Sequence, residues 1–345
     1  MARPVRIGIV GAGANTRSRH IPGFKAIPGV ELVAVSNRTR ASAEKVAAEF
    51  GIGRVAETWR EIVEAPDIDA VCIGTWPNLH GRVTTAALRA GKHVLTEARM
   101  ARNLAEAEAM YAEAQAHPQL VAQIVPAPMS LPFDAAISGL LRDGTLGELR
   151  EVCVTRTNAA ASDAWALMSW RQDFALSGKN TMFLGIYYEM VLRWIGVEPV
   201  SVVADAGVFT RERKDGDGAA QSVLIPDSLG VFGVYPSGAR LVAHFSGLEP
   251  SQPRNEIRLN GSRAGLRLDL VRNELWLARL GGTEQPVEIA PEQRGAWRVE
   301  ADFIASVRDG APVRLTDFAT GVKYMRFTEA VWESWNAGGA RVTLE

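Results

Sequence analysis

Near its N-terminus the chain runs Val5-Arg6-Ile7-Gly8-Ile9-Val10-Gly11-Ala12-Gly13-Ala14-Asn15-Thr16, an apolar segment that passes directly into a glycine-rich turn. The apolar residues predict a buried strand over Arg6–Val10, and a helical pattern follows the turn. Gly11 permits the tight turn, and Gly13 lets the backbone approach a pyrophosphate at the helix N-terminus. Thr16 replaces the third glycine of the G-x-G-x-x-G pattern, where a small residue packs helix against strand. In this context the pattern predicts a dinucleotide site built from Gly11, Gly13, Ala14, Asn15 and Thr16.

Strand and helix patterns alternate through the first third of the chain. The further predicted strands are Glu31–Ser36, Ala70–Thr75, Lys92–Glu97 and Leu120–Val125. The predicted helices are Ser42–Phe50, a helix after the capping pair Thr58 and Glu61, His80–Ala90 and Leu104–Ala116. This βαβ series predicts a doubly wound, mostly parallel Rossmann sheet over residues 1–125.

The alternation of strand and helix patterns ends at Pro126–Pro132. This segment has three prolines in seven residues and is the predicted domain boundary. The predicted strands beyond it are Glu148–Thr157, Val200–Val208, Gly230–Tyr235, Ala239–Ser246, Glu256–Asn260 and Gly265–Asp269. The predicted helices are Phe133–Asp143, Lys179–Ile195, Trp297–Arg308 and Phe318–Asn336. Residues 126–345 are therefore predicted to form an α+β domain with a large, open, mostly antiparallel sheet, and Arg211–Ala220 an exposed loop.

Composition excludes several classes of protein. The 345 residues carry a net charge of -1 with no basic block, so nucleic acid is not an expected partner. Cys72 and Cys153 are the only cysteines, which gives neither a disulfide framework nor a zinc site and fits a reducing cytoplasm. No apolar run is long enough to span a bilayer, and no metal cluster is expected. A small-molecule substrate is the expected partner.

The end of the second predicted strand indicates which dinucleotide binds. It runs Ser36-Asn37-Arg38-Thr39-Arg40 and lacks the acidic residue that would accept hydrogen bonds from an adenosine ribose. Asn37 removes that negative charge, and Ser36, Arg38 and Arg40 offer a hydroxyl and two cations that suit a 2′-phosphate, so NADP is favoured over NAD on charge complementarity. The alternative is that the arginines are solvated and NAD binds.

Further stretches, taken with the fingerprint, resemble the Gfo/Idh/MocA oxidoreductases (glucose–fructose oxidoreductase, inositol dehydrogenase and relatives) over essentially the whole chain. They are Trp76-Pro77-Asn78-Leu79-His80, Gly91-Lys92-His93-Val94-Leu95-Thr96-Glu97, Gly144-Thr145-Leu146-Gly147-Glu148-Leu149, Ser169-Trp170-Arg171 and Gly185-Ile186-Tyr187. The resemblance implies a Rossmann domain followed by an open-faced α/β domain. It also adds Thr75, Trp76, His80 and Glu97 to the expected cofactor contacts. Glu97 would meet the nicotinamide half, whereas His80 has a structural alternative.

The catalytic residues of that family are replaced in this chain. The family's Glu-Lys-Pro stretch is here Glu97-Ala98-Arg99, and its Asp-x-Gly-x-His pattern begins at Phe183 and ends at Tyr187. Tyr187 could donate a proton to a reduced carbonyl or imine, assisted by Lys179 and with Glu97 nearby. The alternative is that Tyr187 packs in the core with its hydroxyl satisfied.

Residues near Tyr187 in sequence are candidates for substrate contacts: Trp170, Arg171, Asn180 and Tyr188. Arg171 could instead form an ion pair with Asp173, which we consider the better interpretation, and Lys179 and Asn180 could simply begin the helix.

Two functions are compatible with these observations. The first is an NADP-dependent oxidoreductase acting on a small carbonyl, imine or hydroxyl compound, which the cluster of polar replacements favours. The second is a catalytically inactive NADP-binding sensor or regulator. The resemblance also implies a homodimer or homotetramer formed through the sheet, using apolar residues of Leu229–Tyr235 and Leu241–Phe245. Helices of the same chain could cover that face instead.

Overall fold

The computed structural model describes residues 3–344, and the chain divides into two compact units. Unit 1 comprises Met1–Pro126 and Arg298–Met325, and unit 2 comprises Ala127–Trp297 and Arg326–Glu345. The prediction that all of 126–345 forms the second domain is wrong for Arg298–Met325. That segment contacts unit 1 at the edge of the sheet, where Ile124 N donates to Thr316 O (3.0 Å). A contact between residues so far apart in sequence cannot be predicted from local sequence patterns.

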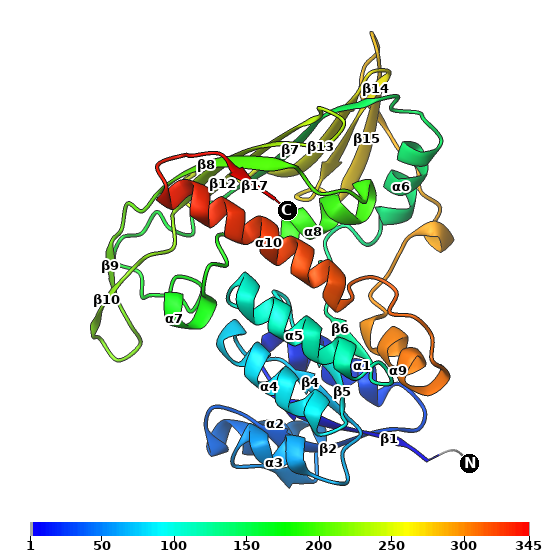
Figure 1. Cartoon of the computed structure of the whole chain (residues 1–345), viewed down its shortest axis with the longest axis vertical. Helices are drawn as coiled ribbons and strands as arrows, with labels where there is room; N and C mark the ends of the chain where they lie inside the picture. Colours follow the sequence, from blue (N-terminus) through cyan, green and yellow to red (C-terminus); the bar gives the residue numbers. More distant parts are fainter. Residues whose placement is uncertain (1–2, 345) are drawn as a thin grey trace. The chain divides into compact units, whose positions relative to one another are not determined.

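Unit 1 contains a six-stranded parallel sheet in the order β3-β2-β1-β4-β5-β6. Figure 1 labels each of these strands except β3. Its strands are β1 (Val5–Val10), β2 (Val30–Ser36), β3 (Arg54–Val55), β4 (Ala70–Ile73), β5 (His93–Thr96) and β6 (Ala122–Ile124). The order reverses between β1 and β4, and ligands of such sheets bind outside the carboxyl ends of the strands at this point. The predicted Rossmann architecture is confirmed.

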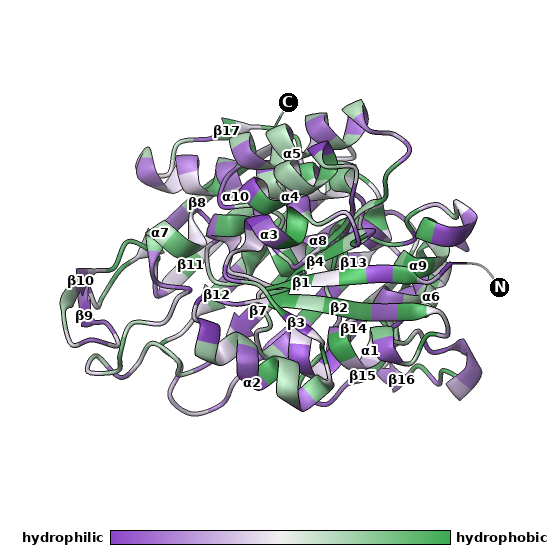
Figure 2. Cartoon of the chain, turned by 90° about the horizontal axis from the view of Figure 1, so that it is seen from below, coloured by the Kyte–Doolittle hydropathy of each residue, from purple (hydrophilic) through white to green (hydrophobic). Residues whose placement is uncertain are grey.

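Capping residues and glycines mark the ends of several helices of unit 1. They are a π-helical turn (Thr16–His20), α1 (Ile21–Lys25), α2 (Arg40–Phe50), α3 (Trp59–Glu64), α4 (Pro77–Arg89), α5 (Leu104–Ala116) and α9 (Val299–Asp309). The predicted capping box is present, since Thr58 N donates to Glu61 Oε1 (3.1 Å). Gly51 ends α2 with a φ of 68°, a left-handed conformation that favours glycine. Strands β1 and β2 are predominantly hydrophobic (Figure 2), as strands covered on both faces must be.

Unit 2 is built on a nine-stranded sheet in the order β16-β15-β14-β13-β7-β12-β11-β8-β17. All neighbouring strands are antiparallel except β7 and β12. The strands are β7 (Leu149–Thr157), β8 (Ser201–Gly207), β11 (Ser228–Val234), β12 (Arg240–Ser246), β13 (Asn255–Gly261), β14 (Ala264–Asp269), β15 (Glu274–Arg279), β16 (Gln285–Pro286) and β17 (Val342–Thr343). The large, mostly antiparallel sheet is therefore confirmed.

The helices of unit 2 are α6 (Asp134–Arg142), α7 (Phe174–Ser177) and α8 (Leu184–Ile195), and α10 (Phe318–Asn336) includes residues of both units. The predicted helix Lys179–Ile195 starts later, at Leu184, because Met182 and Phe183 adopt left-handed backbone angles.

The segment Arg211–Ala220 is largely exposed, as expected, but it is not a loop throughout. Strand β9 (Glu212–Lys214) pairs with β10 (Ala220–Ser222). Arg213 is only 3% exposed, and its guanidinium donates to the carbonyls of Asp163 (2.7 Å) and Ala166 (3.0 Å). The sequence pattern could not show these backbone acceptors, which make burial of the cation possible.

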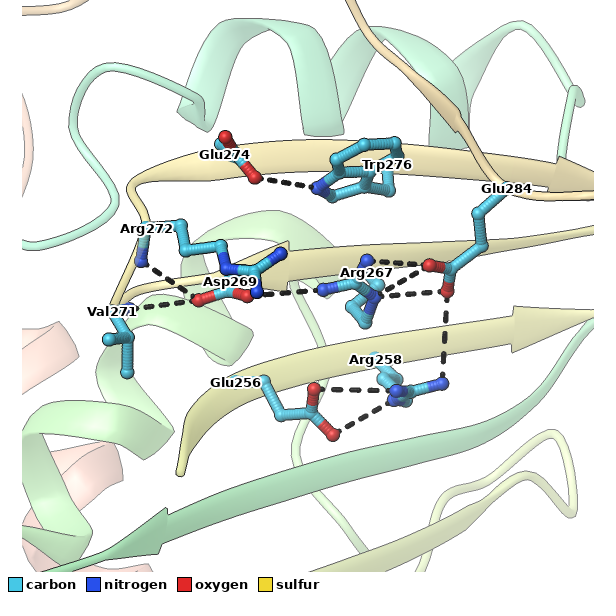
Figure 3. A network of polar contacts seen from close by, with 9 residues as sticks. All are labelled: Glu256, Arg258, Arg267, Asp269, Val271, Arg272, Glu274, Trp276 and Glu284. Atoms are coloured by element: carbon cyan, nitrogen blue, oxygen red, sulfur yellow. Dashed lines mark hydrogen bonds and ion pairs between the residues drawn. The ribbon is translucent and has the colours of Figure 1, made fainter. Parts of the chain in front are cut away.

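The two faces of the unit 2 sheet differ in chemistry. The inner face is mostly apolar; Phe245 contacts Tyr187 of α8, and Ala204 N donates to Ser334 Oγ of α10 (2.8 Å). The outer face carries a network of ion pairs and hydrogen bonds across β13, β14 and β15 (Figure 3). Its members are Glu256, Arg258, Arg267, Asp269, Val271, Arg272, Glu274, Trp276 and Glu284. Within residues 3–344, no helix has the length and apolar character needed to cross a membrane.

Candidate dinucleotide site and catalytic residues

The fingerprint loop is fixed by bonds to the end of β2. Gly11 has a φ of 83°, and its amide donates to Ser36 O (2.8 Å). The next amide, of Ala12, donates to Asn37 Oδ1 (2.7 Å). Asn37 therefore shapes the loop through its neutral side chain and adds no negative charge beside it.

Thr16 changes where the loop packs closely. Its side chain is buried and donates from Oγ1 to Gly11 O (3.2 Å). A Cβ added at Gly74 would lie 2.0 Å from Thr16 Oγ1 and 2.3 Å from Gly11 O. The loop and the segment after β4 thus approach each other closely because Gly74 has no side chain, a role that a third fingerprint glycine would otherwise have. Gly74 was not predicted as part of the site.

The two arginines beyond β2 have different surroundings. Arg40 forms ion pairs with Glu44 (2.8 Å) and with Glu57. The guanidinium carbon of exposed Arg38 lies 5.3 Å from the centre of the Trp76 ring, and Arg38 forms no ion pair within residues 3–344. Arg38 is therefore the cation left available for an anionic group at this edge.

A buried acid–base network lies beside the loop in unit 1. Glu97, directly after β5, accepts hydrogen bonds from Asn15 and from Nε2 of His20 (3.0 Å). The other ring nitrogen of His20, Nδ1, lies 2.5 Å from Glu300 Oε1 on α9. His20 is fully buried, and the side chain of Glu97 is 17% exposed. The predicted residues Asn15 and Glu97 are thus brought together, along with His20 and Glu300, which sequence reasoning missed.

This arrangement keeps His20 positively charged. Burial alone would lower the pKa of His20, but the hydrogen bonds and charges of Glu300 and Glu97 outweigh it and raise the pKa to about 9. Burial would likewise raise the pKa of Glu97, but His20 and Asn15 outweigh it and lower the pKa. At neutral pH the network therefore holds an imidazolium between carboxylates at the carboxyl end of the parallel sheet.

His80 has the structural role that was its alternative. It is fully buried; Nδ1 lies 2.9 Å from Arg99 O and Nε2 lies 3.0 Å from Thr75 O. Burial is the largest influence on its pKa, which is lowered. His80 ties together the segments that follow β4 and β5, and so positions Thr75 and Trp76 without itself offering a free ring nitrogen.

Tyr187 lies on the inner face of the unit 2 sheet. Its side chain is 2% exposed, and its hydroxyl donates to Asn255 Oδ1 (2.6 Å). Burial raises the pKa of Tyr187, although Arg156 and Asn255 act in the opposite direction. Lys179, the expected assisting cation, pairs instead with Glu329, and the cation beside Tyr187 is Arg156. The phenol is therefore protonated at neutral pH.

Two of the expected substrate contacts serve the packing of unit 2. Tyr188 is 3% exposed and stacks on Phe327 with the ring centres 3.8 Å apart. Asn180 is 1% exposed and donates from Nδ2 to Ser177 O (2.7 Å). In the structure both residues stabilise the approach to α8 and its packing.

Trp170 and Arg171 remain partly accessible, and the expected pair between Arg171 and Asp173 is wrong. Asp173 caps α7 by accepting from Ala175 N (2.8 Å), which occupies its carboxylate. The Arg171 guanidinium lies instead 4.2 Å from the Trp170 ring centre and 4.8 Å from the Phe183 ring centre. In the part of the chain that the structure describes, no three His, Cys, Asp or Glu side chains are grouped to hold a metal ion.

The residues of unit 1 fit a nicotinamide dinucleotide. The loop amides precede a helical turn at the carboxyl end of β1, Gly11 and Gly74 leave no side chain in the way, and Arg38 stands at the end of β2. Bound there, the group would donate or accept a hydride.

Comparison with known proteins also indicates a nicotinamide-dependent oxidoreductase. A family model described as an oxidoreductase family with an NAD-binding Rossmann fold matches residues 5–124, and a GFO/IDH/MocA C-terminal domain model matches residues 135–267. The dTDP-3,4-didehydro-2,6-dideoxy-alpha-D-glucose 3-reductase of Streptomyces antibioticus is 29% identical over 321 residues, 90% of this chain and 91% of that protein.

Solved structures show the same fold. Levoglucosan dehydrogenase in complex with NADH and L-sorbose superposes with a TM-score of 0.86 at 21% identity, over 100% of both chains. The aldose-aldose oxidoreductase of Caulobacter crescentus superposes with a TM-score of 0.81 at 25% identity, over 99% of this chain and 100% of that one. The chain therefore belongs to the GFO/IDH/MocA family and is an oxidoreductase that uses a nicotinamide cofactor.

Proposed function

We propose that the protein transfers a hydride between NADP(H) and a carbonyl or hydroxyl carbon of a small, sugar-like compound. The observation that carries the proposal is the fingerprint loop held at the carboxyl end of β1, with Arg38 available beyond β2 and no acidic residue there. The names of the similar 3-reductase and of levoglucosan dehydrogenase support the sugar-like substrate class.

The direct test is isotope transfer. Protein supplied with NADPH deuterated at nicotinamide C4 should transfer deuterium to carbon when offered a panel of ketoses, aldoses and cyclic imines. Mass spectrometry of the products measures the transfer. Tight NADPH binding with no transfer to any member of the panel would contradict the proposal.

Two residues of the chain are proposed to act in cofactor binding and in proton transfer. Glu97, kept ionised by His20, is proposed to contact the nicotinamide half of the cofactor from the end of β5. Tyr187 is proposed to hold the proton, since a phenol whose pKa is raised by burial is protonated at neutral pH and so has a proton to donate but is not a base. This favours reduction over oxidation.

Replacement of Tyr187 by phenylalanine is expected to lower kcat for carbonyl reduction by roughly a hundredfold or more, with KM little changed, because general-acid catalysis commonly contributes that factor. Stopped-flow NADPH oxidation measures the rate. Tyr188→Phe is the matched control, since it removes a neighbouring phenol hydroxyl that has no hydrogen-bond partner within the described residues. If Tyr187→Phe kept its full rate, Tyr187 would have no part in the chemistry.

Replacement of Arg38 by glutamine is expected to weaken NADP binding roughly ten- to hundredfold, because a charge-assisted hydrogen bond to the 2′-phosphate is lost. NAD binding should not change. Fluorescence titration measures both. Arg40→Gln is the control, since Glu44 and Glu57 already neutralise Arg40. Equal losses for NAD and NADP would assign Arg38 a role in loop stability instead of phosphate selection.

A cofactor-binding sensor without turnover is the second candidate. It is favoured by one observation, that the Tyr187 hydroxyl is buried and already bonded to Asn255. The isotope experiment separates the two functions, because a sensor binds NADPH and transfers no deuterium.

We also propose that the outer face of the sheet joins two copies of the chain. Phe232 is 61% exposed there and lies opposite Val203 of β8 and Val242 of β12, which gives an apolar row across three strands. Light scattering should report a dimer or tetramer that Phe232→Lys dissociates. A wild-type monomer at micromolar concentration would contradict this.

A further inference from the structure

Two arginines and one aromatic ring meet at one end of the unit 2 sheet. Arg156 lies on β7, between Asn255 on β13 and Phe245 on β12, on the same face as Tyr187. Its guanidinium carbon is 4.1 Å from the centre of the Phe183 ring, and that of Arg171 is 4.8 Å from the same point. Both cations therefore gather on the ring that precedes α8.

The positive charge of this cluster has no counterpart in the described chain. Neither Arg156 nor Arg171 forms an ion pair within residues 3–344, whereas Arg193 pairs with Asp134 (2.5 Å) and Glu189 (2.5 Å) and Arg267 pairs with Glu284 (2.5 Å). Burial and then the charge of Arg156 lower the pKa of Arg171, and no carboxylate acts in the opposite direction. Like charges held this close are unfavourable without an anion.

The backbone beneath the cluster is held in an unusual conformation. Phe183 has a φ of 69° and Met182 a φ of 46°, and non-glycine residues seldom adopt such angles. The turn is held by Leu184 N, which donates to Thr181 O (2.8 Å), and by Ile186 N, which donates to Phe183 O (3.0 Å). Strain of this kind persists where the surroundings impose it and is concentrated at ligand sites.

We propose that Arg156 and Arg171, stacked on Phe183, form a binding site for an oxyanion of the substrate, a carboxylate or a phosphate. A guanidinium presents planar paired donors that match both groups, and an anion would neutralise the two cations. Arg156 is half-buried and Arg171 is exposed, so a ligand can reach them. The inference rests on the proposed function, and it narrows the substrate class to sugar acids or sugar phosphates.

The test is calorimetric titration of the full-length chain saturated with NADP⁺, which keeps added anions out of the dinucleotide site. The probes are gluconate, inorganic phosphate and the neutral polyol sorbitol. The wild type should bind at least one anion more tightly than sorbitol, and the tighter of the two identifies the group. Arg156→Gln and Arg171→Gln should each weaken that binding roughly ten- to hundredfold.

Two further variants separate a ligand site from a structural role. Phe183→Asp places a carboxylate beside the two guanidiniums and should abolish anion binding, whereas Arg258→Gln, whose partners are Glu256 and Glu284 in the network of Figure 3, should leave it unchanged. The anion should raise the melting temperature of the wild type and not that of Arg171→Gln. Failure of both anions to bind, or equal binding by all variants, would overturn the proposal. The calorimetric experiment measures binding and not turnover. A negative isotope-transfer experiment would therefore contradict the proposed function without contradicting anion binding at Arg156 and Arg171.

Discussion

Replacement of His20 by glutamine is expected to lower the free energy of unfolding by about 3–5 kcal/mol at pH 7, because it removes the cation from between buried Glu300 and the largely buried Glu97. Glu300 is 3% exposed and Glu97 loses both the bond and the charge that lower its pKa. Denaturant unfolding measures the change. His244→Gln, on an exposed position of β12, is the matched control and should change stability little.

The pH dependence gives an independent check. The folded pKa of His20 is about 9 and its ordinary value is 6.5, so folding favours the protonated form. The resulting stability, about 3 kcal/mol, is fully present below pH 6.5 and is lost as the pH rises through 9. Unfolding free energies of the wild type should therefore fall over this window and approach those of His20→Gln. Parallel curves for the two proteins would show that His20 is not the titrating group.

Replacement of Gly74 by alanine should weaken NADP binding roughly ten- to hundredfold, because the added methyl group forces the fingerprint loop to move. The new Cβ would lie 2.3 Å from Gly11 O, a backbone atom that no change of rotamer can withdraw. The thermal midpoint should fall as well, and fluorescence titration of NADPH measures the affinity.

The control for Gly74 is Gly53→Ala in the same unit, where an added Cβ meets no atom within 4 Å. Thr16→Gly should not restore binding to Gly74→Ala, because it removes only the contact with Oγ1 and leaves the clash with Gly11 O. Full recovery in the double variant would instead place the whole obstruction at Thr16.

Local patterns predicted most of the fold. The helices Leu104–Ala116 and Phe318–Asn336 have the predicted bounds, since apolar periodicity and caps act within a few residues. The fingerprint loop was found for the same reason, because its strand, turn and helix are contiguous. The return of Arg298–Met325 to unit 1 was missed, because strand-edge pairing over nearly 200 residues leaves no local mark.

The candidate sites were only partly predictable, since their charges come from distant segments. Sequence reasoning found Glu97 and Asn15, but His20 reaches Glu300 over a separation of 280 residues. It found Arg171 but paired it with the nearby Asp173, whose carboxylate the α7 amides had already engaged. Arg156, the second arginine on the Phe183 ring, lies on β7 and comes close to Arg171 only when the chain folds.

The contribution of Arg298–Met325 to unit 1 has a consequence for how the protein is made. As the ribosome releases the chain from its N-terminus, His20 and Glu97 emerge first, but Glu300 and Thr316 follow only after Ala127–Trp297, which belongs to unit 2. Until then β6 lacks its bond to Thr316, and the imidazolium has one carboxylate in place of two. The dinucleotide-binding unit therefore matures late, and a fragment ending at Pro126 would not reproduce it.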